Sequence, residues 1–148
     1  MSDEQQRQIY QTDGDRYEAL IAREDHQGNI LKAIEEIINP NGLNILDLGA
    51  GTGRFASLFA ARAGSFFAFA LSQNMLAVTR DKLQGLAPDR GLAAAADHRR
   101  LPLPPHCADT VVSGWSVSYL AVWNPDHWRQ ELEIWLAEMR RVLRPGGR

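Results

Sequence analysis

The sequence predicts an α/β fold: a doubly wound, mostly parallel Rossmann-like sheet with helices on both faces. Short apolar segments typical of buried strands alternate with longer segments in which apolar residues recur at helical spacing. In addition, residues 45–53 (ILDLGAGTG) lead from an apolar strand straight into a glycine-rich turn and then a helix. Parallel strands end at a common edge of the sheet, so we expect a ligand site there.

The N-terminal part is predicted to lie beside the sheet within a single domain, 1–148. Residues 1–16 are polar, and we expect a flexible arm. Residues 17–42 are expected to supply N-terminal helices, one of which begins near Asn29 and is ended by the sequence NPNG at 39–42. Residues 43–148 are expected to form the cofactor-binding core, which contains the glycine-rich turn.

Alternating strands and helices are predicted to follow. Residues 54–63 form the helix that leaves the glycine turn, and residues 65–70 form the second buried strand. Ser72 is placed to cap the next helix. Residues 91–96 form a third strand, which we place by the order of elements because alanine is a poor strand former.

The last part of the sequence predicts one more strand and one long helix. Residues 109–114 form the fourth strand. Asn124 is expected to cap the helix, with Pro125 at its first position. The residues of this helix expected to face inward are Trp128, Leu132, Trp135, Leu136, Met139 and Leu143.

The glycine turn indicates the kind of ligand. Gly49, Gly51 and Gly53 stand at alternate positions, which lets a ligand approach the backbone closely and permits torsion angles that a side chain would obstruct. The dinucleotide fingerprint G-x-G-x-x-G needs its third glycine where this sequence has Arg54. The spacing therefore disfavours a nicotinamide-dependent oxidoreductase, as does the lack of a recognisable Tyr-x-x-x-Lys pair.

The sequence resembles the class I S-adenosylmethionine-dependent methyltransferases, in their small-molecule, type 11-like branch. Five stretches carry the resemblance in the right order: the glycine turn, SQNML at 72–76, Asp97, the loop and strand at 101–112, and RVLRPGG at 141–147. The resemblance covers about residues 43–147. It implies the cofactor S-adenosyl-L-methionine and methyl transfer to a small-molecule acceptor, which the sequence does not name; it also names no catalytic residue.

The resemblance implies which residues hold the methionine part of the cofactor. Gly49, Ala50 and Gly51 would present backbone groups to it, and Gly53 completes the turn. Asp47 would place negative charge near the ammonium and sulfonium groups. A purely structural strand-turn-helix junction is the alternative reading of these residues.

The adenosine part is expected to lie across the next two strands. By resemblance, Asp97 would accept a hydrogen bond from the adenine amino group, His98 would offer its backbone N–H to the ring, and Leu71 would pack on the base, with Ser72 nearby. Alternatively, Asp97 caps the turn that follows it. Most relatives end the second strand with an acid that holds the ribose, whereas this sequence has Ala70.

The family pattern continues past Arg148 with a fifth strand, a helix and a hairpin, so we expect a chain truncated at its C-terminus. In a sheet ordered 3-2-1-4 the fourth strand, with Val111 and Val112, would be an edge with unpaired backbone groups. Such an edge predicts a homodimer.

Composition limits the classes of partner. With 148 residues, 45% hydrophobic, 23% charged and a net charge of −2, the sequence suits one globular unit and indicates neither a nucleic-acid nor a membrane partner. The single cysteine, Cys107, and the polar N-terminus favour a cytoplasmic location. We expect no metal site, because His98, His106 and Cys107 share one loop without a matching ligand pair.

Two further questions stay open at this stage. A non-catalytic relative, acting as an interaction or regulatory module with weak or no cofactor binding, is the main alternative function. Trp115, Tyr119 and Trp123 are candidates to line an acceptor pocket, whereas Trp128 and Trp135 lie on an apolar helix face and are expected in the core.

Overall fold

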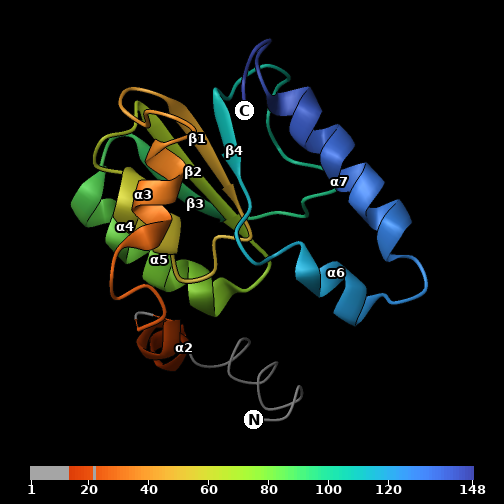
Figure 1. The fold of residues 1–148 in the computed structure, drawn as a ribbon, viewed down its shortest axis with the longest axis horizontal. Helices are drawn as coiled ribbons and strands as arrows, with labels where there is room; N and C mark the ends of the chain where they lie inside the picture. The colour runs from red at the N-terminus through yellow and green to blue at the C-terminus, as the bar shows by residue number, and fades with distance from the viewer. Residues whose placement is uncertain (1–13, 22) are drawn as a thin grey trace.

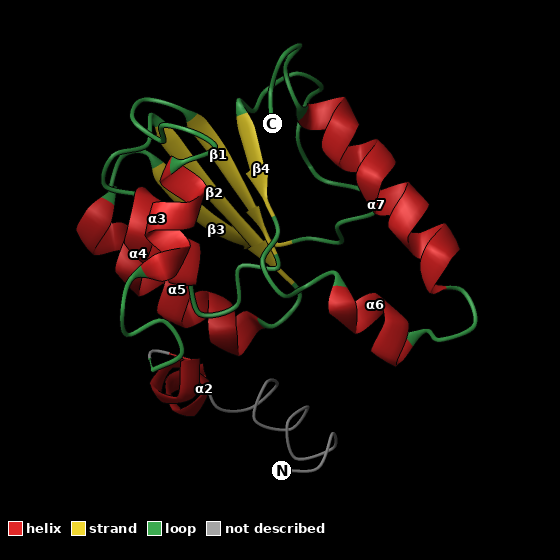
Figure 2. Cartoon of the chain, viewed as in Figure 1, coloured by secondary structure: helices red, strands yellow, loops and turns green. Residues whose placement is uncertain are grey.

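A computed structural model describes residues 14–21 and 23–148 of the chain. One four-stranded sheet lies at its centre, with helices packed against it (Figures 1 and 2). Within the described part, no helix is both long and apolar enough to cross a membrane. The elements in chain order are α2 (Gly14–Ile21), α3 (Asn29–Glu35), β1 (Asn44–Leu48), α4 (Arg54–Phe59), β2 (Ser65–Ala70), α5 (Gln73–Leu86), β3 (Gly91–Ala95), β4 (Thr110–Val112), α6 (Ser118–Trp123) and α7 (Trp128–Val142).

The sheet has the order β3-β2-β1-β4, and all its pairs are parallel. β1 is paired along its whole length with β2, from Asn44↔Ser65 to Leu48↔Phe69, and with β4 on its other side. The predicted fold class is confirmed. Because the strands run in one direction, the glycine turn after β1 lies at the edge shared by all carboxyl ends.

Two apolar clusters cover the two faces of the sheet. On one face Ile45 and Phe66 pack with Phe55 and Phe59 of α4, together with residues of α3 and α5. The other face is covered by α7 and the loop before β4. Alternation along β1 explains both clusters, since successive side chains point to opposite faces. Each large apolar side chain that is fully buried contributes about 1.5–3 kcal/mol.

The described part of the N-terminal region begins with α2 at Gly14, so the last residues of the predicted arm, 14–16, are helical. The rest of the predicted arm, 1–13, lies outside the described residues. α3 begins at Asn29 as predicted, and ends at Glu35 ahead of the NPNG sequence.

The helices after β4 differ from the prediction. A short helix, α6, precedes the long one, and α7 begins at Trp128 without any side-chain cap. Asn124 instead accepts the His127 N–H through its backbone oxygen at 3.2 Å, which makes a turn. The predicted inward stripe is also wrong at Leu136, which is 54% exposed, while Val142 is fully buried. Trp135 and Val142 are seven residues apart and share a face; Leu136 is turned away by about 100°.

The outer edge of β4 is not bare. The Val111 N–H donates to the oxygen of Arg148 at 2.8 Å, and the Arg148 N–H donates to the oxygen of Asp109 at 3.1 Å. This is the pattern of a parallel pair. A turn closed by the Gly147 N–H and the Arg144 oxygen brings the chain back along the strand. The prediction of a row of unpaired groups is therefore wrong at Val111.

Candidate functional site

The three glycines of the turn after β1 all adopt left-handed torsions, with φ of +82° at Gly49, +56° at Gly51 and +83° at Gly53. Their surroundings differ. A Cβ on Gly49 would lie 2.2 Å from Cβ of Ser116, and one on Gly53 would lie 3.0 Å from Oγ1 of Thr79. At Gly51 the nearest atom would be 3.8 Å away. Internal packing therefore requires two of these glycines, whereas a Cβ on Gly51 would make only ordinary contacts, with Met75 and Tyr17.

The amides of the turn are partly occupied. The N–H groups of Gly49 and Ala50 both donate to the oxygen of Phe69 in β2, at 2.8 and 3.0 Å. The Gly51 oxygen accepts from the hydroxyl of Thr79 at 2.9 Å. The Ala50 oxygen accepts the Gly53 N–H at 2.9 Å, so among the described residues the Gly49 oxygen and the Gly51 N–H are the groups of this turn left to face the cofactor. Carbonyl oxygens suit a cationic group, because each can accept two hydrogen bonds.

A cavity of about 170 Å³ opens beside this turn. Ligand pockets usually measure about 300–1,000 Å³, so this one fits part of a cofactor-sized molecule. Trp115, which follows β4, is 57% exposed and adopts φ of +60°, a torsion that few residues other than glycine adopt. The lining residues are Tyr17, Ile21, Glu24, Gly49, Ala50, Gly51, Thr52, Arg54, Phe55, Gly114, Trp115, Ser116 and Tyr119.

Asp47 is an unsatisfied polar residue just before the turn. Its side chain is only 1% exposed, and neither carboxyl oxygen has a hydrogen-bond partner among the described residues. Burial raises the pKa of this carboxyl to about 8. The group is therefore mostly protonated at neutral pH, and the negative charge predicted for it is absent until a cation comes close. A buried polar group without a partner costs about 1–3 kcal/mol, so its presence at this position points to a ligand.

The residues expected at the adenosine end lie at the same edge of the sheet but outside the cavity. Leu71 directly follows β2 and is 68% exposed, which leaves its side chain free to contact a planar ring. Ser72 caps α5 as predicted, its hydroxyl oxygen accepting the Met75 N–H at 3.4 Å. Ala70, where relatives carry the ribose-binding acid, is buried and contributes no polar group.

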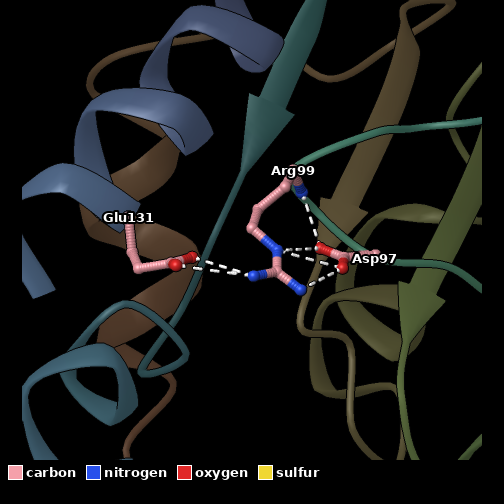
Figure 3. A network of polar contacts seen from close by, with 3 residues as sticks. All are labelled: Asp97, Arg99 and Glu131. Atoms are coloured by element: carbon pink, nitrogen blue, oxygen red, sulfur yellow. Dashed lines mark hydrogen bonds and ion pairs between the residues drawn. The ribbon is translucent and has the colours of Figure 1, made fainter. Parts of the chain in front are cut away.

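Asp97 has partners that the sequence analysis did not anticipate (Figure 3). Its carboxylate accepts from Nε and Nη2 of Arg99, the latter at 2.6 Å, and from the Arg99 backbone N–H at 2.9 Å. Arg99 also reaches Glu131 of α7 at 3.2 Å. The hydrogen bonds from Arg99 lower the pKa of Asp97. The hydrogen bond from the Arg99 backbone N–H agrees with the alternative in which Asp97 caps the following turn. An adenine amino group would have to share the Asp97 carboxylate with Arg99 or displace Arg99 from it.

The side chain of His98 lies close to the glycine turn. Its ring meets that of Trp135 edge-on, with centroids 4.5 Å apart, and its Cε1 would lie 3.6 Å from a Cβ on Gly49. Burial lowers the pKa of this imidazole, which is therefore neutral at pH 7. The ring helps to pack α7 on the sheet edge, while the role predicted for its backbone N–H stays a prediction.

The structure thus gathers part of the predicted set and adds to it. Trp115 and Tyr119 line the cavity, and the rings of Tyr119 and Trp123 stack with centroids 4.8 Å apart, while an acceptor pocket formed by these residues stays a prediction. Glu24 and Arg54 were not predicted as site residues. Among residues 14–21 and 23–148, no group of three or more His, Cys, Asp or Glu side chains is arranged to hold a metal ion.

Comparison with known proteins identifies the family. The model of the family described as "Methyltransferase domain" matches residues 46–148. The chain belongs to this family. The match runs from within β1 to the last residue and so contains the glycine turn, Asp47 and Asp97.

Individual relatives agree with this assignment. The chain is 38% identical over 113 residues to the ubiquinone/menaquinone biosynthesis C-methyltransferase UbiE of Bordetella parapertussis, covering 72% of this chain and 39% of that protein. It is 31% identical over 134 residues to the malonyl-[acyl-carrier protein] O-methyltransferase of Methylococcus capsulatus, covering 89% and 45%. The chain therefore spans about two fifths of the length of these relatives.

A solved structure shows the same fold. The PH0226 protein from Pyrococcus horikoshii superposes with a TM-score of 0.67 at 21% identity, over 94% of this chain and 59% of that one. At this identity the likeness concerns the fold alone. The methyltransferase family rests on the sequence matches, and the fold agrees with them.

Proposed function

We propose that this protein binds S-adenosyl-L-methionine at the turn after β1 and transfers its methyl group to a small-molecule acceptor, in the cytoplasm. The observation that carries the proposal is Asp47, a fully buried carboxyl without a partner, two residues before a turn whose Gly51 faces a cavity. A ligand with an ammonium and a sulfonium group would give the Asp47 carboxyl a positively charged partner. The family match supports the same donor.

The chemistry asks little of the protein beyond positioning. S-adenosylmethionine supplies a methyl group already activated by its sulfonium, and alignment of two reactants can lower a barrier by about 7–11 kcal/mol. Burial raises the pKa of Tyr17 and of Tyr119, so both phenols are neutral at pH 7 and serve as hydrogen-bonding walls of the cavity. The names of the two relatives above specify carbon and oxygen methylation respectively. The proposal therefore names the donor and the class of acceptor, and not the atom that receives the methyl group.

The adenosine end is proposed to extend from the turn towards Leu71 and the loop after β3. Exposed Leu71 would pack on the base, Asp97 would accept from its amino group, and the His98 N–H would donate to the ring. Ala70 supports the alternative of a non-catalytic module, because a lost hydrogen bond to a charged group costs about 1.5–3 kcal/mol, or roughly ten- to a hundredfold in affinity. The same experiment separates the two functions.

The test compares two glycines with similar torsions. Gly51 and Gly42 both have positive φ and room for a Cβ, but only Gly51 lines the cavity. We expect Gly51→Ala and Gly42→Ala to lose similar stability, about 1 kcal/mol, because alanine is strained at either position. We expect only Gly51→Ala to lose affinity for S-adenosylmethionine and its demethylated product, at least tenfold by calorimetry.

The outcomes separate the proposals. Equal donor affinity in Gly51→Ala and Gly42→Ala would remove the turn from the binding site. A wild-type chain that gives no heat and no thermal shift with millimolar donor would favour the non-catalytic module.

A further inference from the structure

Arg54 presents an incompletely used guanidinium to the cavity. It is the first residue of α4, directly after the glycine turn, and its side chain is 16% exposed. Nη2 donates to Oε2 of Glu24 at 2.5 Å and to the oxygen of Ile21 at 3.3 Å. Nη1 is buried and has no partner among the described residues. Nη2 of the guanidinium thus has hydrogen-bond acceptors among the described residues, and Nη1 has none.

The surroundings of Arg54 hold this cation in place without satisfying it. The ring of Trp115 covers the guanidinium, with Cζ 4.5 Å from the ring centroid, and Phe55 stacks behind Trp115 with centroids 6.3 Å apart. An aromatic face attracts the cation but accepts no hydrogen bond in the guanidinium plane. Within the described part of the chain, Glu24 is the carboxylate paired with Arg54, and its side chain is 56% exposed, where ion pairs are weak.

We propose that Arg54 binds the carboxylate of a ligand in this cavity. The inference rests on the proposed function, because it assigns a group within the same site. A guanidinium presents its donors in a planar fork that fits the two oxygens of a carboxylate. Since Nη1 is covered by protein atoms, a neighbouring side chain must shift when the ligand enters.

Two carboxylates are compatible with this chemistry. The donor carries one on the same carbon as its ammonium, and Arg54 lines the same cavity as Gly49 and Ala50, so a single amino-acid group could contact both Arg54 and the turn. An acceptor that is itself a carboxylic acid would present the same group. In both cases Arg54 should make the protein prefer a ligand that carries the carboxylate over the same ligand without it. The experiment tests the donor and the acceptor separately.

The first arm titrates S-adenosylmethionine and decarboxylated S-adenosylmethionine into three proteins: wild type, Arg54→Gln and the control Arg62→Gln. Arg62 also forms an ion pair, with Glu35 at 2.7 Å, but does not line the cavity. If the donor carboxylate binds Arg54, wild type and Arg62→Gln prefer the complete donor at least tenfold, and Arg54→Gln binds both alike. The second arm titrates malonate into each protein saturated with the demethylated product, and an acceptor carboxylate would give binding that Arg54→Gln loses.

The inference is overturned if Arg54→Gln matches wild type in both arms, or if wild type discriminates for a carboxylate in neither. In both cases donor binding by wild type would leave the proposed function standing. Absence of donor binding by wild type would instead remove the proposed function. If Arg54→Gln does not fold, Arg54→Lys replaces it, because lysine keeps the charge and a long aliphatic side chain. Arg54→Lys is expected to bind the donor with a smaller preference for the carboxylate.

Discussion

At the scale of the residue, Asp47 is the clearest departure from ordinary packing. A carboxyl that is fully buried and has no partner lowers the stability of the free protein, and burial raises its pKa to about 8. Replacement by an amide side chain would remove the cost of ionisation, and replacement by an apolar side chain would also remove the unpaired polar atoms. Such a carboxyl lies two positions before the first glycine of a turn that lines a cavity, as expected of a binding site for a cation before the cation arrives.

Asp47→Asn is therefore expected to stabilise the free protein at neutral pH. Because the pKa of Asp47 is raised in the folded state, its favourable contribution is complete below about pH 4 and is lost as the pH rises to about 8. Across that window it makes wild-type stability fall by up to about 1.4 kcal/mol per pH unit. Urea denaturation of both proteins from pH 4 to 8 should show a difference that widens with pH. A constant difference would mean that Asp47 is ionised in the fold.

Arg99 provides a second prediction at this scale. If Asp97 accepts from adenine, the ion pair in Figure 3 competes with the donor, and Arg99→Ala should raise donor affinity. Both side chains are about half exposed, so the gain should be small, at most about fivefold. Arg144→Ala, which breaks the ion pair with Asp109 at 2.8 Å, serves as control. Unchanged affinity in both Arg99→Ala and Asp97→Ala would remove Asp97 from the adenine site.

At the scale of the element, α5 holds the glycine turn in place. Thr79 is fully buried, and its hydroxyl donates to the Gly51 oxygen at 2.9 Å. Thr79→Val keeps the shape but leaves that oxygen without its partner. We expect a loss of about 1–3 kcal/mol in stability and weaker donor binding, measured by denaturation and calorimetry. Thr110, also buried but away from the cavity, offers Thr110→Val as a control for the change in side chain.

The sequence predicted the strands better than the helices that follow them. β1 and β2 are buried on both faces, so their apolar runs and the turn signals that bound them identify them directly. α6 buries none of its residues, and its six-residue segment carries no periodic signal. The start of α7 was placed too early because Asn124 and Pro125 form a turn there, although the same pair is also typical of a helix start.

The site was predictable where local geometry decides it. The glycine turn and the cap at Ser72 follow from neighbouring residues. The ion pair of Asp97 depends in part on Glu131, 34 positions away on α7, whose placement needs the whole fold. The packing of Ser116 on Gly49 likewise depends on the path of the loop after β4. Sequence spacing alone does not show such contacts.

At the scale of the whole molecule, the parallel sheet is the rigid part, and the segment after β4 is more loosely held. β1 is hydrogen-bonded on both sides, whereas α6 is covered by little of the protein. We expect amide hydrogen exchange to be slowest in β1 and β2 and fast in α6, with donor binding slowing exchange around Trp115. Equal protection of β1 and α6 would show that the protein opens as one unit.

The pairing of Arg148 with β4 bears on assembly. A homodimer through this edge stays a prediction, but the N–H of Val111 is already bonded, so fewer groups are open to a second chain. The proposal for the site is that the cationic end of the donor binds near Asp47 and the glycine turn.

The most direct test of that claim is the proton balance of donor binding. Calorimetric titration of S-adenosylmethionine at pH 7, in buffers of different ionisation enthalpy, measures the protons released. If the cationic donor binds beside Asp47, wild type releases a proton as this carboxyl ionises, and Asp47→Asn binds more weakly and releases none. Binding heats that do not depend on the buffer, with equal affinity in Asp47→Asn, would contradict the account.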